Sequence, residues 1–126
     1  MPPPSDNETW VIEIGDVVLR KEAGSGAATL LPWERLVHCL WVADYGMRNA
    51  GDLDTAADVY SQFQSEGVRL ATELSLPLTR EAFSLSKHDF ENQYFDRFET
   101  ICEEIKAARP VGAVELPKRR TRTKKE

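Results

Sequence analysis

The sequence has few of the residues on which catalysis and metal binding most often depend. Its 126 residues include two cysteines and two histidines, and they contain no HExxH, CxxC or glycine-rich phosphate-binding motif. His38 and Cys39 are neighbours on a predicted helix, so their side chains point about 100° apart and cannot form a nucleophile–base pair. A zinc site would need carboxylates recruited from distant parts of the chain. We therefore expect no catalytic residue, no metal site and no cofactor.

Long apolar runs are also missing, and we expect no secretory leader. No stretch approaches the roughly 20 apolar residues of a membrane helix. The first ten residues, MPPPSDNETW, lack the basic and apolar regions of a signal peptide. Cys39 and Cys102 each lie on an apolar helical face, and we expect both to be buried as small hydrophobic residues. A cytoplasmic protein is the simplest expectation.

The stretch Leu31–Asp52 gives the strongest structural signal in the chain. Pro32 suits the first turn of a helix, where a backbone N–H has no partner in any case. Apolar residues follow it at helical spacing; they are Trp33, Leu36, Val37, Leu40, Trp41 and Met47. Gly51 can end the helix in the left-handed conformation, and Asp52 or Asp54 can cap the next helix. We expect this helix to be the first arm of a helical hairpin and the centre of the fold.

Asp44 interrupts the apolar face of this predicted helix. The simpler interpretation is a half-buried carboxylate that pairs with Arg48, four residues later. The alternative is a functional or fold-specifying acid, for example one that acts with His38 in an enzyme or metal protein.

The rest of the chain predicts a single, mainly α domain over residues 9–109, with three long helices and one short one. A second long helix is expected over residues 53–75, where Gly67 marks the close approach of another helix. A short helix, capped by Thr79, and a last long helix that opens at Ser86 complete the helical part.

The N-terminal part predicts β structure. Two β-branched runs, residues 10–14 and 17–21, are separated by Gly15 and Asp16, which is typical of a short hairpin. A single strand followed by a loop fits almost as well. Residues 23–30 are expected to form a flexible connector, and residues 1–8 a disordered N-terminus.

Charge is distributed unevenly along the chain. Residues 1–105 contain 19 acidic and 8 basic residues, whereas residues 106–126 contain 2 acidic and 8 basic residues. Carboxylates four residues apart on a helix are separated by about 6 Å of rise, and a DNA strand carries a phosphate about every 3.4 Å along the axis. Acidic helices can therefore attract a basic partner, although ordinary solvated faces remain the alternative. The candidate partner-binding residues are Asp54, Asp58, Asp96, Glu99 and Glu103.

Residues 110–126 are expected to be a disordered basic tail, for which a solubilising role is the simplest interpretation. Its clustered bases are Lys118, Arg119, Arg120, Arg122, Lys124 and Lys125. No aromatic residue lies between them, so a weak contact with nucleic acid would be independent of sequence. The tail could equally fold back onto the acidic domain.

The central stretch resembles a DNA-mimic protein family that was first catalogued as a domain of unknown function. In that family a helix of the form E-R-L, two or three apolar residues, L-W and an acid leads into a turn rich in asparagine and glycine. The matching residues here are Glu34, Arg35, Leu36, Leu40, Trp41, Asp44, Asn49, Ala50 and Gly51. The segment AFSLSKHDFENQYFDRFETICEEI is similar to the closing helices of the family, so the resemblance covers about residues 31–108.

The turn departs from the family pattern. Arg48-Asn49-Ala50-Gly51 stands where the family has paired asparagines and paired glycines, and Asp52-Leu53-Asp54 replaces the aromatic and glutamine residues that normally follow. The role of the turn in the relatives is therefore not carried over. The resemblance implies a helical, acidic protein that binds a DNA-binding protein in place of DNA, although many relatives have no assigned role.

The leading hypothesis is a non-enzymatic acidic interaction protein whose partner is a basic, DNA-binding protein. Two alternatives remain at this point. One is an immunity or antitoxin-like protein that blocks a specific toxin, and the other is a domain with no DNA-mimic role.

Overall fold

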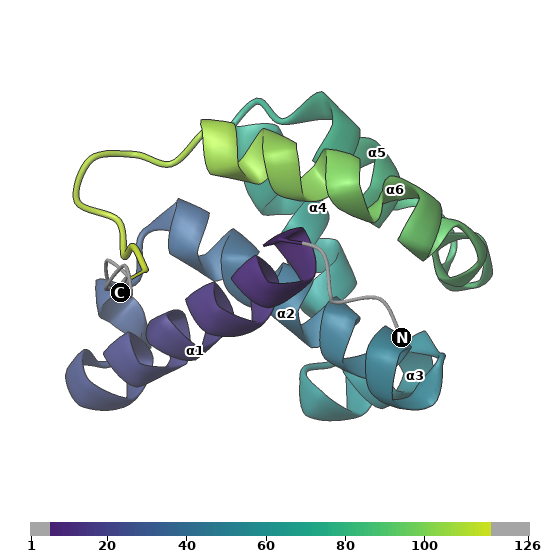
Figure 1. The fold of residues 1–126 in the computed structure, drawn as a ribbon, viewed down its shortest axis with the longest axis horizontal. Coiled ribbons are helices and arrows are strands. Elements are labelled where there is room, and N and C mark those ends of the chain that lie inside the picture. Colours follow the sequence, from purple (N-terminus) through teal and green to yellow (C-terminus); the bar gives the residue numbers. More distant parts are fainter. Residues whose placement is uncertain (1–5, 117–126) are drawn as a thin grey trace, which may run out of the picture.

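The computed structural model describes residues 6–116, and this part of the chain is mainly helical, as predicted (Figure 1). It contains six α-helices and one short 3₁₀ turn, η1, and no strand. Their bounds are α1 Asp6–Ser25, η1 Ala27–Thr29, α2 Pro32–Ala50, α3 Leu53–Val59, α4 Phe63–Glu73, α5 Pro77–Ser84 and α6 Lys87–Ala107. Among the helices of residues 6–116, none is long and apolar enough to cross a bilayer.

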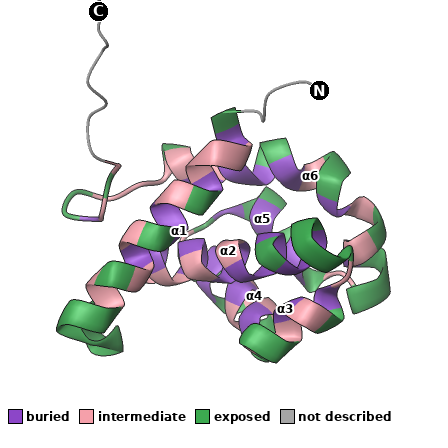
Figure 2. Cartoon of the chain, turned by 60° about the horizontal axis from the view of Figure 1, so that its bottom comes forward, coloured by how far each residue is buried: buried purple, intermediate pink, exposed green. Residues whose placement is uncertain are grey.

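Helix α2 lies at the centre of the fold, as the sequence predicted. It packs against α1, α3, α4 and α6, and its inner side is almost continuously buried (Figure 2). Pro32 occupies the first turn, and Gly51 ends the helix in the left-handed conformation with a φ of 75°. Asp52 then caps α3, because its side chain accepts a hydrogen bond of 2.8 Å from the Thr55 N–H. The local signals that bound this helix are therefore confirmed.

The predicted N-terminal hairpin is wrong, because residues 6–25 form one helix, α1. Its buried residues Asn7, Val11, Ile14 and Val18 follow one another at steps of four, three and four. Packing of this face on α2 outweighs the strand preference of the β-branched residues, which depends strongly on context. Residues 6–8 are therefore helical, in contrast to the expected disorder, while residues 1–5 lie outside the described part of the chain.

Gly15 belongs to a helix–helix contact, although the sequence pattern placed it in a turn. A Cβ atom at Gly15 would overlap Cδ1 of Trp41, so only glycine lets α1 approach α2 this closely. The C-terminal end of α1 and η1 also occupy most of residues 23–30, which were expected to be a flexible connector.

The predicted second long helix is divided into α3 and α4. The chain leaves the helical conformation at Tyr60, whose φ of −153° is extended, and α4 begins at Phe63. The expected close approach at Gly67 is confirmed, because a Cβ atom there would overlap Cδ1 of Phe83 in α5. Helix α5 begins at Pro77, so Thr79 lies buried inside its first turn and is not its cap.

Helix α6 follows the prediction closely. The Ser86 side chain accepts a hydrogen bond of 3.1 Å from the Asp89 N–H and starts the helix. The buried face of α6 comprises Phe90, Tyr94, Phe98, Ile101, Cys102 and Ile105. Burial also raises the pKa of the Cys39 and Cys102 thiols, and both cysteines are free.

After α6 the chain turns back toward the start of α2 (Figure 1). This segment, residues 110–116, was expected to belong to the disordered tail, but it packs onto the helices. Ala113 is buried, and the Val114 N–H donates to Oε2 of Glu34 at 2.8 Å. The six clustered bases of the tail, from Lys118 to Lys125, lie outside the described residues.

Candidate functional site

Two carboxylates of α6 are used inside the fold as caps of other helices. Glu91 accepts a hydrogen bond of 2.8 Å from the Leu53 N–H, at the start of α3. Glu104 accepts hydrogen bonds from the N–H groups of Leu78 and Thr79, at 3.1 and 2.6 Å, at the start of α5. Free N–H groups and the helix dipole make a helix N-terminus a favourable place for a carboxylate. These two acids are therefore structural.

A second group of carboxylates lies on the outer face of α6. Asp96, Glu99 and Glu103, hereafter the acidic stripe, are exposed and follow one another at steps of three and four. The Nδ2 atom of Asn7 donates to Oε1 of Glu99 at 2.5 Å and to Oε2 of Glu103 at 3.0 Å. The Asn7 amide is neutral, so it orders these carboxylates without cancelling their charge, although Nζ of Lys106 lies 3.8 Å from Oε2 of Glu103 and partly offsets that one. The structure thus brings together three of the five predicted partner-binding residues.

A shallow hollow adjoins the acidic stripe. It is lined by Leu78, Glu99, Thr100, Glu103 and Glu104. Leu78 is 46% exposed, so the hollow offers an apolar surface beside carboxylates. Lysine and arginine side chains have an apolar stem and a cationic end. The stem can contact Leu78 while the cation lies near the carboxylates.

The other two predicted residues, Asp54 and Asp58, lie on α3. Both are exposed and are four residues apart, so they share a face of that short helix. Asp54 forms an ion pair with Lys87 at the start of α6. Asp54 and Asp58 therefore lie on a different helix from the acidic stripe. Lys87 also partly neutralises the charge of Asp54.

Asp44 pairs with Arg48, as the simpler interpretation predicted, but it is buried instead of half-buried. Its Oδ1 atom accepts hydrogen bonds from the Tyr94 hydroxyl at 2.6 Å and from Nε of Arg48 at 2.9 Å. Burial raises the pKa of Asp44, and these two donors act against the rise. His38 instead contacts the rings of Trp41 and Tyr60, at centroid distances of 6.3 and 5.5 Å. Asp44 and His38 therefore engage different neighbours and do not form a joint site.

The residues of the family-like motif also serve the fold. Glu34 is completely buried and accepts hydrogen bonds from the Leu31 N–H at 2.7 Å and from Nζ of Lys21 at 2.8 Å. Arg35 pairs with Glu66 at 2.8 Å, and Glu66 also accepts a hydrogen bond of 2.6 Å from the Tyr60 hydroxyl. Glu66 was not predicted from the sequence, because no local pattern distinguishes it from other acids.

The remaining motif residues lie around the same helix. Trp41 packs against Gly15 of α1, and Gly51 ends α2. The side chain of Asn49 donates a hydrogen bond of 2.8 Å to the Tyr45 carbonyl oxygen, within α2 itself. The motif is thus explained by contacts inside the molecule.

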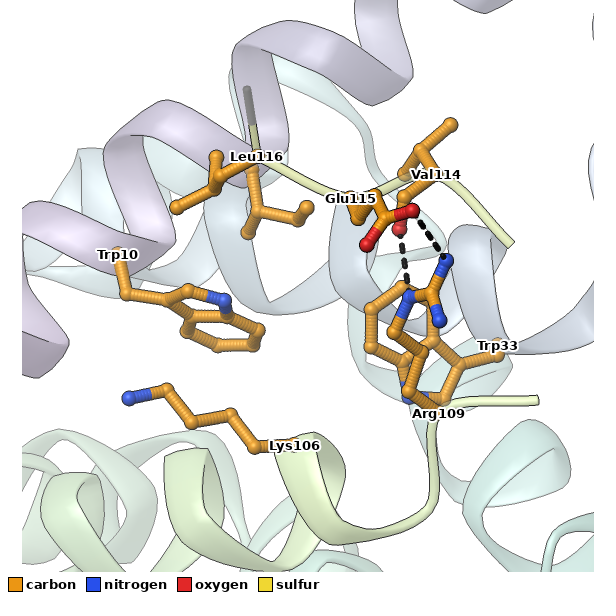
Figure 3. A pocket seen from close by; sticks show the side chains of 8 residues that line it. Trp10, Trp33, Lys106, Arg109, Val114, Glu115 and Leu116 are labelled. Atoms are coloured by element: carbon orange, nitrogen blue, oxygen red, sulfur yellow. Dashed lines mark hydrogen bonds and ion pairs between the residues drawn. The ribbon is translucent and has the colours of Figure 1, made fainter. Parts of the chain in front are cut away.

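A pocket of about 210 Å³ lies where α1, α6 and the segment 110–116 meet (Figure 3). Its lining residues are Trp10, Ile14, Trp33, Lys106, Arg109, Val114, Glu115 and Leu116. This pocket was not predicted from the sequence, because its two sides are separated by most of the chain and no local spacing connects them.

Within residues 6–116, no group of three or more histidine, cysteine, aspartate or glutamate side chains is placed to hold a metal ion. Comparison with protein-family models, with curated proteins and with solved structures finds no match for this chain. A function must therefore be inferred from the geometry of the chain itself.

Proposed function

We propose that this chain is a non-enzymatic, acidic interaction protein that binds a basic, DNA-binding protein in place of DNA. The observation that best supports this proposal is the acidic stripe of α6 together with the hollow beside it. Three exposed carboxylates follow one another on one helix, and two of them, Glu99 and Glu103, adjoin an apolar surface at Leu78.

The net negative charge of the described residues also favours a basic partner. Residues 6–116 contain 20 acidic and 10 basic residues. An excess of one sign steers partners of opposite charge to the surface and raises the rate of association. Asp96 and Glu103 are separated by about 10 Å of helix rise, which is of the order of a few phosphate steps along a DNA strand.

The hollow gives the proposed surface a means of selecting protein side chains. A lysine or arginine of the partner would lay its stem on Leu78 and place its cation between Glu99 and Glu103. Because Asn7 already orders both carboxylates, little side-chain freedom is lost when the cation binds.

A toxin-blocking protein, of the immunity or antitoxin type, is the second candidate. It is favoured by Phe95, which lies beside Asp96 on α6 and is 51% exposed. A contact built around this aromatic ring would depend less on charge and would not compete with DNA for its partner.

The two candidates are separated by affinity capture from a lysate of the source cells at low and high salt. A DNA mimic recovers a DNA-binding protein that is lost at high salt and is displaced by duplex DNA. Recovery of a partner whose binding is affected neither by salt nor by duplex DNA would contradict the DNA-mimic proposal and favour the toxin-blocking function.

Once the partner is identified, neutralising the acidic stripe tests the surface directly. The variant D96N/E99Q/E103Q removes three charges, while the glutamine amides at positions 99 and 103 still offer Asn7 a side-chain oxygen. We expect affinity for the partner to fall by about tenfold or more, since charged hydrogen bonds contribute about 1.5–3 kcal/mol each. Isothermal titration calorimetry measures the change.

The matched control is D16N/E73Q/E81Q, which removes three exposed carboxylates from α1, α4 and α5. Each of these pairs with an arginine on the surface, so its loss costs little stability. The control should bind the partner within about twofold to threefold of the unmodified chain. Equal binding by both triple variants would show that the acidic stripe is not the contact surface.

A further inference from the structure

The pocket at the junction of α1, α6 and segment 110–116 is bordered by two tryptophans. Trp10 from α1 and Trp33 from α2 lie on different sides of it, and Leu116 lies on the Trp10 side (Figure 3). Trp33 is fixed in place, because it is 1% exposed and its indole N–H donates to the Ile105 carbonyl oxygen at 2.8 Å. Because Trp33 has almost no exposed surface, the half-buried Trp10 supplies the indole face that suits a planar, apolar ring.

Two cationic side chains border the pocket, and they differ in what they contact. The Arg109 guanidinium is used to hold segment 110–116, because its Nε donates to the Val114 carbonyl oxygen at 3.0 Å and another nitrogen lies 3.8 Å from the Glu115 carboxylate. Lys106 reaches over the Trp10 ring, with Nζ 5.2 Å from its centroid. Its carboxylate neighbour, Glu103, is 3.8 Å away and 68% exposed.

We propose that this pocket binds a small planar carboxylate, such as an aromatic acid. The ring lies against Trp10, next to the buried Trp33, and the carboxylate accepts hydrogen bonds from Nζ of Lys106. Because Glu115 also lines the pocket and pairs with Arg109, the preference for an anionic ligand depends on Lys106. A volume of about 210 Å³ limits the ligand to one ring or two fused rings. This site is formed by residues outside the acidic stripe, so it does not depend on the proposed function.

The test is a titration with 2-naphthoate, followed by NMR through the indole N–H signals of the three tryptophans. Trp41 does not line the pocket and serves as an internal reference. We expect the signals of Trp10 and Trp33 to shift in a saturable manner while that of Trp41 stays in place. The neutral analogue 2-naphthamide, which has the same ring system and no charge, should bind about tenfold more weakly.

The variant Lys106→Met removes the cation and keeps an unbranched side chain. It should weaken 2-naphthoate binding by about tenfold and abolish the preference for the acid over the amide. The control Arg80→Met also removes one positive charge, from an exposed position on α5, and should leave binding unchanged. The proposal is overturned if neither tryptophan shifts, if Trp41 shifts equally, or if the acid and the amide bind alike to the unmodified chain.

Discussion

The local sequence around Asp44 predicts only one of the two hydrogen-bond partners of this residue. Its pairing with Arg48 is a contact between residues four apart on a helix, and spacing alone predicted it. Its second partner, Tyr94, is 50 residues away and belongs to α6. Nothing in the local sequence identifies that partner, because it is set by how α6 docks on α2. The same limit applies to Glu34, whose contact with Val114 spans 80 residues.

The Tyr94 hydroxyl should therefore contribute measurably to stability. The variant Tyr94→Phe removes this donor and leaves the buried Asp44 carboxylate with Arg48 alone. We expect the free energy of unfolding to fall by about 1–3 kcal/mol, which urea denaturation measures. Tyr45→Phe is the control, because Tyr45 is 41% exposed, and it should change stability by less than about 0.5 kcal/mol. Equal effects of the two variants would show that the bond between Tyr94 and Asp44 contributes little.

At the scale of helices, the sequence predicted α2 and α6 well and α1 poorly. Glu34 and Gly51 cap the two ends of α2, and Ser86 caps the start of α6. The apolar residues of both helices repeat at steps of three and four. Residues 10–21 instead contain two β-branched runs around Gly15, and this local preference was given more weight than the helical spacing of Val11, Ile14 and Val18. The spacing was the signal that could have identified α1.

Two glycines of α1 provide a test of the helical packing. Alanine normally favours a helix over glycine, but at Gly15 it would clash with Trp41. We expect Gly15→Ala to destabilise the chain by about 1–3 kcal/mol in thermal or urea unfolding. A Cβ atom at Gly24 meets nothing within 4 Å, so Gly24→Ala should be stabilising by about 0.4–1 kcal/mol. If both variants were stabilising, α1 would not approach α2 as described.

At the scale of the whole molecule, an excess of acidic residues could be read from the sequence, but their separate roles could not. Glu91 and Glu104 look like surface charges in the sequence of α6, yet they cap α3 and α5. Glu99 and Glu103 come from the same helix and remain on the surface. The difference depends on which side of α6 faces the other helices, which is a property of the assembled fold.

Buried carboxylates also make the stability of the molecule depend on pH. Burial alone would raise the pKa of Glu34, but hydrogen bonds from Lys21 and from the backbone at Leu31 and Val114 outweigh it and hold that pKa below its ordinary value of 4.5. The pKa of Glu66 is lowered in the same way by Tyr60 and other donors. A lowered carboxyl pKa stabilises the fold above the ordinary pKa, and this contribution is lost as the pH falls below 4.5.

The variant Glu34→Gln isolates this contribution. It should lower the free energy of unfolding by about 2–3 kcal/mol at pH 7 and make the fall in stability below about pH 4.5 shallower. Urea denaturation at a series of pH values measures both changes. The exposed control Glu73→Gln should change the free energy of unfolding at pH 7 by less than about 0.5 kcal/mol. Burial raises the pKa of Asp44, so this residue makes stability increase as the pH falls. Comparing Glu34→Gln with the unmodified chain separates the contribution of Glu34 from that of Asp44. An unchanged acid slope in Glu34→Gln would contradict the role given to Glu34.

The caps that α6 supplies to α3 and α5 also determine when the chain can finish folding during synthesis. Helices α3 and α5 have 7 and 8 residues, and helices this short are unstable in isolation. Asp52 caps α3 locally, but the N–H of Leu53 in α3 and the N–H groups of Leu78 and Thr79 in α5 are bonded by Glu91 and Glu104, which belong to the last helix to be translated. We therefore expect the nascent chain to stay incompletely folded until α6 has left the ribosome.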